Sequence, residues 1–368
     1  MANSTEERFD GHGAAAAEPG LAPQPQAGGA SAPRSPGTTY RAFARLLGSP
    51  GGRALVALVL VVCMGLVFNA DGAFFKIATH RDTLRQASVP GILACGMTLV
   101  IITGGIDLSV GSILALVAVM FSYMSIHWGW SPWVGVPLCL LIGAGCGSIS
   151  GSLVSWMKVQ PFIATLAVMT FARGLAKTVS GNKKIASAVL NPDGTYTYID
   201  VPGIFRTIDS RILGDNITVV SLILAVCFLL TLVVLAKHRW GRELYAIGGN
   251  EEAARLSGVP VTRAKFLVYV VCGMLAAVAG MCQAAQEQQG DSEAGTGYEL
   301  TAIAMVVIGG TTLAGGRGGL QLTLLGILTV GYLQKVLSIN AVPEASRLML
   351  TGFIIVLAVL TQRRRRLA

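Results

Sequence analysis

Ten long apolar runs divide this 368-residue chain, and they constrain its fold more than any other feature. A helix needs about 20 apolar residues to cross the roughly 30 Å of hydrocarbon in a bilayer. Charged residues make up 13% of the chain, whereas soluble proteins usually contain about 25%. We therefore expect an all-α polytopic membrane protein with about ten transmembrane helices. The runs span residues 54–69, 88–103, 108–126, 133–156, 162–180, 217–236, 267–284, 300–315, 319–338 and 347–362.

The first, second and eighth runs are short for a complete span, so re-entrant or broken helices are the alternative there. The 45 glycines suit helices that pack closely in lipid. The seven cysteines all lie in apolar runs, without a Cys-x-x-Cys pair or a neighbouring histidine. We expect them to be small buried side chains rather than metal ligands or disulfides. They are Cys63, Cys95, Cys139, Cys146, Cys227, Cys272 and Cys282.

The first 50 residues have a different composition from the rest. From Gly11 to Gly37, 19 of 27 residues are Ala, Gly or Pro, which is too few large apolar groups to offset the entropy of ordering. We expect residues 1–50 to be a disordered cytoplasmic tail and residues 51–368 to be the membrane domain. The first apolar run begins only at Ala54, so it predicts an uncleaved helix rather than a signal peptide.

The positions of lysine and arginine predict the orientation in the membrane. With the N-terminus inside, 17 of these residues fall in inside segments and 7 in outside segments, so both termini are predicted to be cytoplasmic. The net charge of +9 is concentrated between apolar runs and at Arg363–Arg366. This distribution favours anchoring beside anionic membrane lipid and argues against a nucleic-acid partner.

Two connecting segments are long enough to carry structure of their own. The outer segment, residues 180–216, contains a predicted turn at Asn191–Gly194 followed by a short strand over Thr195–Ile199. The inner segment, residues 237–266, contains a predicted helix of about two turns. Asn250 is its expected N-cap, and Gly258 its expected end. A helix this short is unstable alone, so either the surface of this chain or a partner must hold it.

Residues 104–111 and 309–316 share the pattern Gly-Gly-x-x-Leu-x-x-Gly after an apolar run. Such internal repetition is typical of transporter halves, although chance is the alternative in a chain so rich in glycine. Asp107 is expected to cap the following helix, with a role in gating as the alternative. The candidate residues for helix breaks and gating are Gly104, Gly105, Asp107, Ser109, Gly111, Gly309 and Gly310.

Arg173 and Lys177 share one face of a helix near its predicted outer end. Neither Asp107 nor Arg173 has an evident partner of opposite charge in the sequence. We interpret Arg173 and Lys177 as side chains that reach the outer membrane interface. Contact with a substrate or with a docking protein is the alternative.

The sequence contains no Gly-x-x-x-x-Gly-Lys motif followed by Ser or Thr, so we expect no phosphate-binding loop in this chain. We also identify no catalytic residues, no metal ligands and no cofactor site. The chain is therefore predicted not to be an enzyme. Paired intramembrane acids, which an ion-coupled carrier usually needs, are likewise not evident.

Residues 96–112, 246–259 and 297–310 together resemble the ribose/xylose/arabinose family of ATP-binding cassette (ABC) importer permeases. The resemblance implies a membrane permease subunit that moves a monosaccharide, a pentose or similar sugar, across the bacterial inner membrane. It implies a second copy of the chain, ABC ATPase subunits and a periplasmic sugar-binding protein as partners. The rival hypotheses are an ion-coupled or facilitative sugar carrier without an ATPase, and an export or lipid-handling channel on the same scaffold.

The resemblance also implies that the short inner helix is the coupling helix that docks in the ATPase. The residues assigned to this role are Asn250, Glu251, Glu252, Ala253, Ala254, Arg255, Leu256, Ser257 and Gly258.

Overall fold

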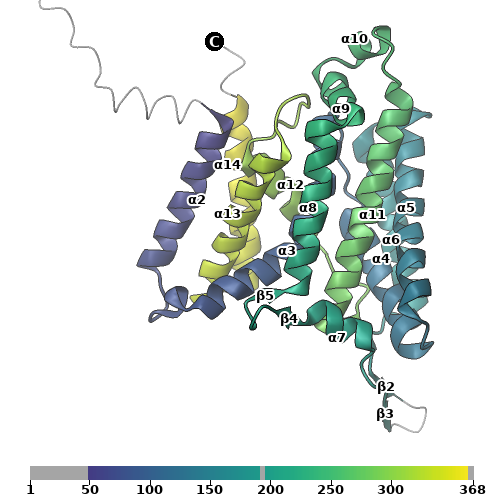
Figure 1. Cartoon of the computed structure of the whole chain (residues 1–368), viewed down its shortest axis with the longest axis vertical. Helices are drawn as coiled ribbons and strands as arrows, with labels where there is room; N and C mark the ends of the chain where they lie inside the picture. The colour runs from purple at the N-terminus through teal and green to yellow at the C-terminus, as the bar shows by residue number, and fades with distance from the viewer. Residues whose placement is uncertain (1–48, 191–194, 364–368) are drawn as a thin grey trace, which may run out of the picture. The chain divides into compact units, whose positions relative to one another are not determined.

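Helices dominate the computed structural model, which describes residues 49–190 and 195–363 (Figure 1). Each of the ten apolar runs falls on one of ten helices. They are α2 (Pro50–Val67), α3 (Ile77–Ile102), α4 (Val110–Ser122), α5 (Pro132–Ser155), α6 (Pro161–Ser180), α8 (Val219–Lys237), α11 (Val261–Glu287), α12 (Tyr298–Gly309), α13 (Leu320–Ile339) and α14 (Glu344–Arg363). The expectations for residues 1–48, for the turn at Asn191–Gly194 and for Arg364–Arg366 lie outside the described residues.

Eight helices of the described chain are long and apolar enough to cross a membrane. They are α2, α3, α4 together with the π-helical turn Tyr123–His127, α5, α6, α8, α11 and α13. Helix α12 is apolar but has only 12 residues. It ends at Gly309, before the end of the predicted run 300–315, because Gly310 takes a φ of +109°. The structure therefore confirms an all-α polytopic membrane protein, with eight candidate spans and a shorter apolar helix.

The remaining elements are short and lie in the connecting segments. They are the 3₁₀ helix Ala73–Phe75, α7 (Gly203–Asp209), α9 (Arg239–Gly249) and α10 (Glu251–Leu256). Three antiparallel pairs join β1 (Ile185–Ala186) to β6 (Gln289–Gly290), β2 (Ala188–Leu190) to β3 (Tyr196–Tyr198), and β4 (Arg211–Ile212) to β5 (Ile217–Thr218). The predicted strand over Thr195–Ile199 is confirmed as β3.

Helix α11 lies at the centre of the packing and contacts α3, α4 and α5. Glycines let α5 and α11 approach until their backbones touch. A Cβ atom added to Gly143 would lie 2.3 Å from the carbonyl oxygen of Gly273, and the reverse substitution would leave 2.2 Å. At this contact the helices therefore pack through small residues and direct backbone contact rather than through interlocking side chains, as is common where helices pack in lipid.

The expectation that all seven cysteines are buried is wrong for Cys63. Six of them are buried, but Cys63 is exposed on α2. The cause is that α2 meets the rest of the chain through a narrow face, formed by Gly52, Ala54 and Gly65. The side chains on its other faces are left uncovered by the described chain.

Candidate functional site

The inner segment folds into two consecutive short helices, α9 and α10. The side chain of Asn250 accepts a hydrogen bond from the amide of Ala253 at 3.0 Å, and Gly258 takes a φ of +80° after α10 ends. The predicted N-cap and the predicted end of this helix are therefore confirmed. Figure 1 shows α10 at one extremity of the helices, beyond the end of α8. We refer to this side as the α10 end, and to the other side as the opposite end.

One face of α10 is attached to the rest of the chain. Ala254 is buried, and the Glu251 carboxylate bonds both Arg255, at 2.9 Å, and Lys265 at the start of α11. Partial burial opposes ionisation of Glu251, but the hydrogen bond and the positive charges of Lys265, Lys158 and Arg255 outweigh it. The pKa of Glu251 is therefore lowered. An ionised Glu251 holds α10 against α11.

The other face of α10 meets no part of the described chain. Glu252, Ala253, Arg255 and Ser257 are exposed, and Leu256 exposes 82% of its surface. A groove of about 320 Å³ lies beside it, between α9 and the turn after α10, and Arg239 and Arg242 help to line it. This face of α10 and the groove beside it are therefore left uncovered by the described chain.

The end of α9 packs directly against the backbones of two distant turns. A Cβ atom on Gly248 would lie 1.8 Å from the carbonyl oxygen of Ile102 and 2.4 Å from the amide of Gly316. The Gly316 amide donates to the Ile102 carbonyl at 2.9 Å, and a Cβ atom on Gly315 would lie 2.8 Å from the Gly104 amide. We call Ile102, Gly104, Gly248, Gly315 and Gly316 the glycine junction.

The glycine junction brings together the two copies of the sequence repetition, because Gly104 lies in one and Gly315 and Gly316 lie in the other. Tyr245 on α9 adds a side-chain link, since its hydroxyl donates to the carbonyl of Gly318 at 3.0 Å. Sequence reasoning singled out the repetition and the inner helix separately, without placing them in contact.

The first repeat interrupts the chain between α3 and α4. Gly104 takes a φ of +78°. The buried Asp107 accepts hydrogen bonds at Oδ1 from the Ser109 amide, at 2.9 Å, and from the Ser109 hydroxyl, at 2.5 Å. Its Oδ2 has no hydrogen-bond partner within the described residues. The N-cap residue of α4 is Ser109, so the expectation that Asp107 is the cap is corrected: Asp107 stabilises the turn before α4 by binding Ser109.

The other candidate glycines occupy different local positions. Gly310 follows α12 in the left-handed region, whereas Gly309 is the last residue of that helix and lies against α13. Gly111 lies inside α4, where a Cβ atom would be 2.4 Å from Oε2 of Glu299. Gly105 lies beside the hydroxyl of Tyr269. Gly111 and Gly309 therefore mark close helix contacts rather than interruptions.

Arg173 and Lys177 have partners within the chain that the sequence did not reveal, and their placement at the membrane interface stays a prediction. Arg173 donates to the carbonyls of Ser292, at 2.5 Å, and Ala294, at 2.9 Å, while Lys177 pairs with Glu293 at 2.6 Å. Together they tie α6 to the segment that precedes α12. The acidic residues gathered at 291–299 in a basic chain were the sequence signal that could have indicated partners for these two cations.

The α10 end is built from short helices, glycine-rich turns and surface side chains. Among the residues that the structure describes, no group of three or more His, Cys, Asp and Glu side chains is placed to hold a metal ion. The features of the α10 end are a face of α10 that the described chain leaves uncovered and a backbone contact that leads from α9 to both glycine-rich turns.

Comparison with known proteins agrees with this geometry. The model of the family described as branched-chain amino acid transport system / permease component matches residues 81–359. The ribose import permease protein RbsC of Escherichia coli is 38% identical over 314 residues, which cover 85% of this chain and 94% of RbsC. The fructose import permease protein FrcC of Rhizobium meliloti is 34% identical, covering 84% of each chain. The xylose transport system permease protein XylH of Escherichia coli is 30% identical, covering 83% of this chain and 90% of XylH.

No solved structure matches the chain. The eight candidate spans and the bacterial permease relatives identify a multi-pass protein of the inner membrane. Since the family model covers most of the chain and the relatives align over nearly their full length, the chain belongs to this family of permease components, the membrane subunits of ABC importers.

Proposed function

We propose that the chain is the permease subunit of an ATP-driven importer for a monosaccharide, a pentose or similar sugar. Three relatives named as ribose, fructose and xylose permeases support the sugar class. The excess of lysine and arginine in the predicted inside segments supports a cytoplasmic α10 end. A periplasmic sugar-binding protein then delivers substrate at the opposite end, and two copies of the chain form the path.

The ATPase subunit docks on the exposed face of α10, from Asn250 to Gly258. The observation that carries this proposal is the combination of an 82% exposed Leu256 with an attached opposite face. When the ATPases close, they displace α10 and α9 as a unit. The glycine junction passes this displacement to the turns at Gly104 and Gly315, which changes the relative positions of α3, α4, α12 and α13.

Leu256→Asp tests this role, because it places a charge at the centre of the proposed contact without touching the described core. The matched control is Leu213→Asp, which changes another exposed leucine at the opposite end. Loss of a hot-spot residue at the centre of an interface costs about 2 kcal/mol or more, which is over tenfold in affinity. We expect Leu256→Asp to lose at least about tenfold in co-purification of the ATPase and Leu213→Asp to retain it.

The second measurement is uptake of labelled ribose into proteoliposomes that contain the chain, its ATPase and its binding protein. We expect uptake to require ATP and all three components. Uptake by the chain alone, driven by an ion gradient, would establish the carrier without an ATPase instead. Normal ATPase retention by Leu256→Asp would show that the coupling contact lies elsewhere.

A further inference from the structure

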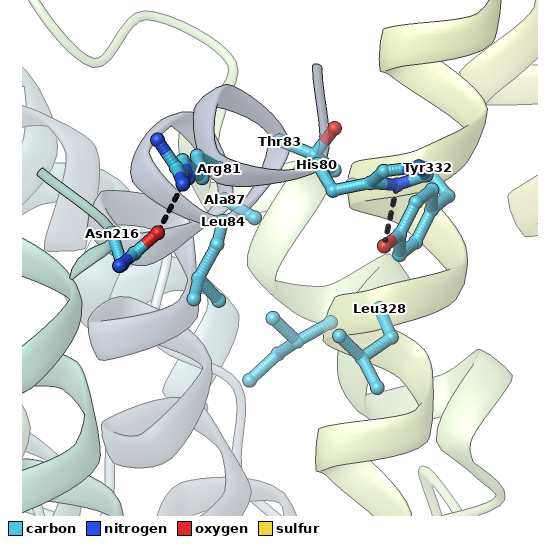
Figure 2. Close-up of a pocket in the computed structure, with 10 residues that line it drawn as sticks. His80, Arg81, Thr83, Leu84, Ala87, Asn216, Leu328 and Tyr332 are labelled. Atoms are coloured by element: carbon cyan, nitrogen blue, oxygen red, sulfur yellow. Dashed lines mark hydrogen bonds between the residues drawn. The ribbon is translucent and has the colours of Figure 1, made fainter. Parts of the chain in front are cut away.

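A pocket of about 300 Å³ lies between the first turns of α3 and the middle turns of α13, toward the opposite end of the bundle. It is separate from the glycine junction, which lies at the far end of α3. Figure 2 shows two polar pairs on opposite sides of one end of the pocket, Arg81 with Asn216 and His80 with Tyr332, and it shows Leu328 toward the other end. The pocket therefore has an amphipathic lining.

The polar end carries an uncompensated positive charge. The Arg81 guanidinium donates to the side-chain oxygen of Asn216, and among the described residues no carboxylate pairs with it. The adjacent Asp82 is already engaged by Arg211, at 3.3 Å, and Lys335, at 3.7 Å. His80 and Tyr332 lie on the other side of this end, with Nδ1 and the hydroxyl 3.2 Å apart (Figure 2). The Arg81 guanidinium is the charged donor that suits a phosphate group.

Beyond the pocket, an apolar face continues along α13 toward the first residue of that helix. Leu324, Leu328 and Tyr332 are spaced four residues apart, so they lie on one face of the helix. Leu324 lies about two turns nearer the first residue of α13 than Tyr332 does, and it exposes 38% of its surface. Eight residues of helix cover roughly 12 Å, which is close to the roughly 15 Å of hydrocarbon in one leaflet. The apolar lining thus follows the path of a lipid tail.

We propose that this groove binds a phospholipid with an anionic headgroup. The headgroup phosphate contacts Arg81, and one acyl chain lies along Leu328 and Leu324. A free sugar fits the lining poorly, because its hydroxyls need partners on several sides and the walls at Leu84, Ala87 and Ile327 offer none. The bound lipid fills the gap between α3 and α13 and holds these two helices together.

The test measures lipid binding to the purified full chain in detergent by native mass spectrometry. Phosphatidylglycerol and phosphatidylcholine with identical acyl chains are the probes. We expect a preference for phosphatidylglycerol, with one tightly retained molecule per chain. Arg81→Gln keeps an amide donor but removes the charge, and should weaken phosphatidylglycerol binding about tenfold. Arg81→Lys should retain most of it.

Arg206→Gln is the matched control, because Arg206 is an exposed cation on α7 outside the pocket. It should bind phosphatidylglycerol as the unmodified chain does. Melting temperatures without added lipid should agree among all variants and so report intact folding. Equal phosphatidylglycerol binding by Arg81→Gln and the unmodified chain would overturn the proposal. So would competition by glycerol 3-phosphate, which lacks acyl chains, or displacement of the lipid by a free monosaccharide.

Discussion

At the scale of single residues, Gly248 has no space for a side chain, whereas its neighbour Gly249 has nothing within 4 Å of an added Cβ atom. The two residues end the same helix and differ in what they face. Gly248 faces the carbonyl of Ile102, which belongs to the turn after α3. Comparing substitutions at these two glycines therefore separates the effect of the backbone contact at the glycine junction from the effect of replacing any glycine in α9.

Gly248→Ala should therefore separate α9 from the turns it touches, at a cost of about 1–3 kcal/mol for overpacking. We expect ATP hydrolysis stimulated by the sugar-loaded binding protein to fall about fivefold or more, since 1 kcal/mol corresponds to a factor of about five. Gly249→Ala should leave it unchanged. Equal stimulation in both variants would show that the junction does not transmit the movement of α10.

Local residue patterns were readable from the sequence, whereas distant pairings were not. The Asn250 cap and the Gly258 end depend on neighbours within a few positions, and both were predicted. The partners of Arg173 lie 119 and 121 residues further along the chain. Nothing in the local pattern around Arg173 specifies those carbonyls, so these partners were not predicted.

At the scale of elements, α10 is held largely by one carboxylate, and this makes its attachment dependent on pH. The pKa of Glu251 is lowered in the folded chain. A lowered pKa means that the attachment is fully present above the ordinary pKa of about 4.5, and is lost as the pH falls through the lowered value. Near neutral pH the helix should therefore remain attached.

A nitroxide spin label at Ser257→Cys, in a Cys63→Ala background, measures this attachment. Label mobility should stay constant from pH 7 to about 4.5 and should rise below that as Glu251 becomes protonated. Glu251→Gln should show high mobility throughout the range. Constant low mobility in that variant would mean that the burial of Ala254, rather than the ion pair, holds α10.

Element positions followed from hydropathy because a membrane span must be apolar over its own length. All ten runs fall on helices, but the boundaries of α3 and α12 differ from the runs. Helix α3 begins at Ile77, eleven residues before the run, since its polar first turns pack against the loops at the opposite end. Helix α7 was missed because seven residues show too little periodicity to indicate a helix.

At the scale of the whole molecule, the cysteines report how the helices enclose one another. Cys63 is exposed and the other six are buried. The folded chain in detergent should therefore react with N-ethylmaleimide at Cys63 well before the others, whereas the chain unfolded in dodecyl sulfate should react at all seven. Mass spectrometry of the intact chain counts the additions. Rapid modification of Cys95 or Cys282 in the folded chain would contradict the packing of α3 and α11.

The contact of α9 with the two turns consists of peptide groups, and peptide groups have no rotamers in which to absorb a displacement. Three segments that are far apart in the sequence thus behave there as one rigid body. A push on α10 by a fraction of an ångström has to appear as a tilt of whole helices. The distance that the far end of a helix moves is then set by the length of the helix, because a small rotation at the end near α9 displaces the far end by more.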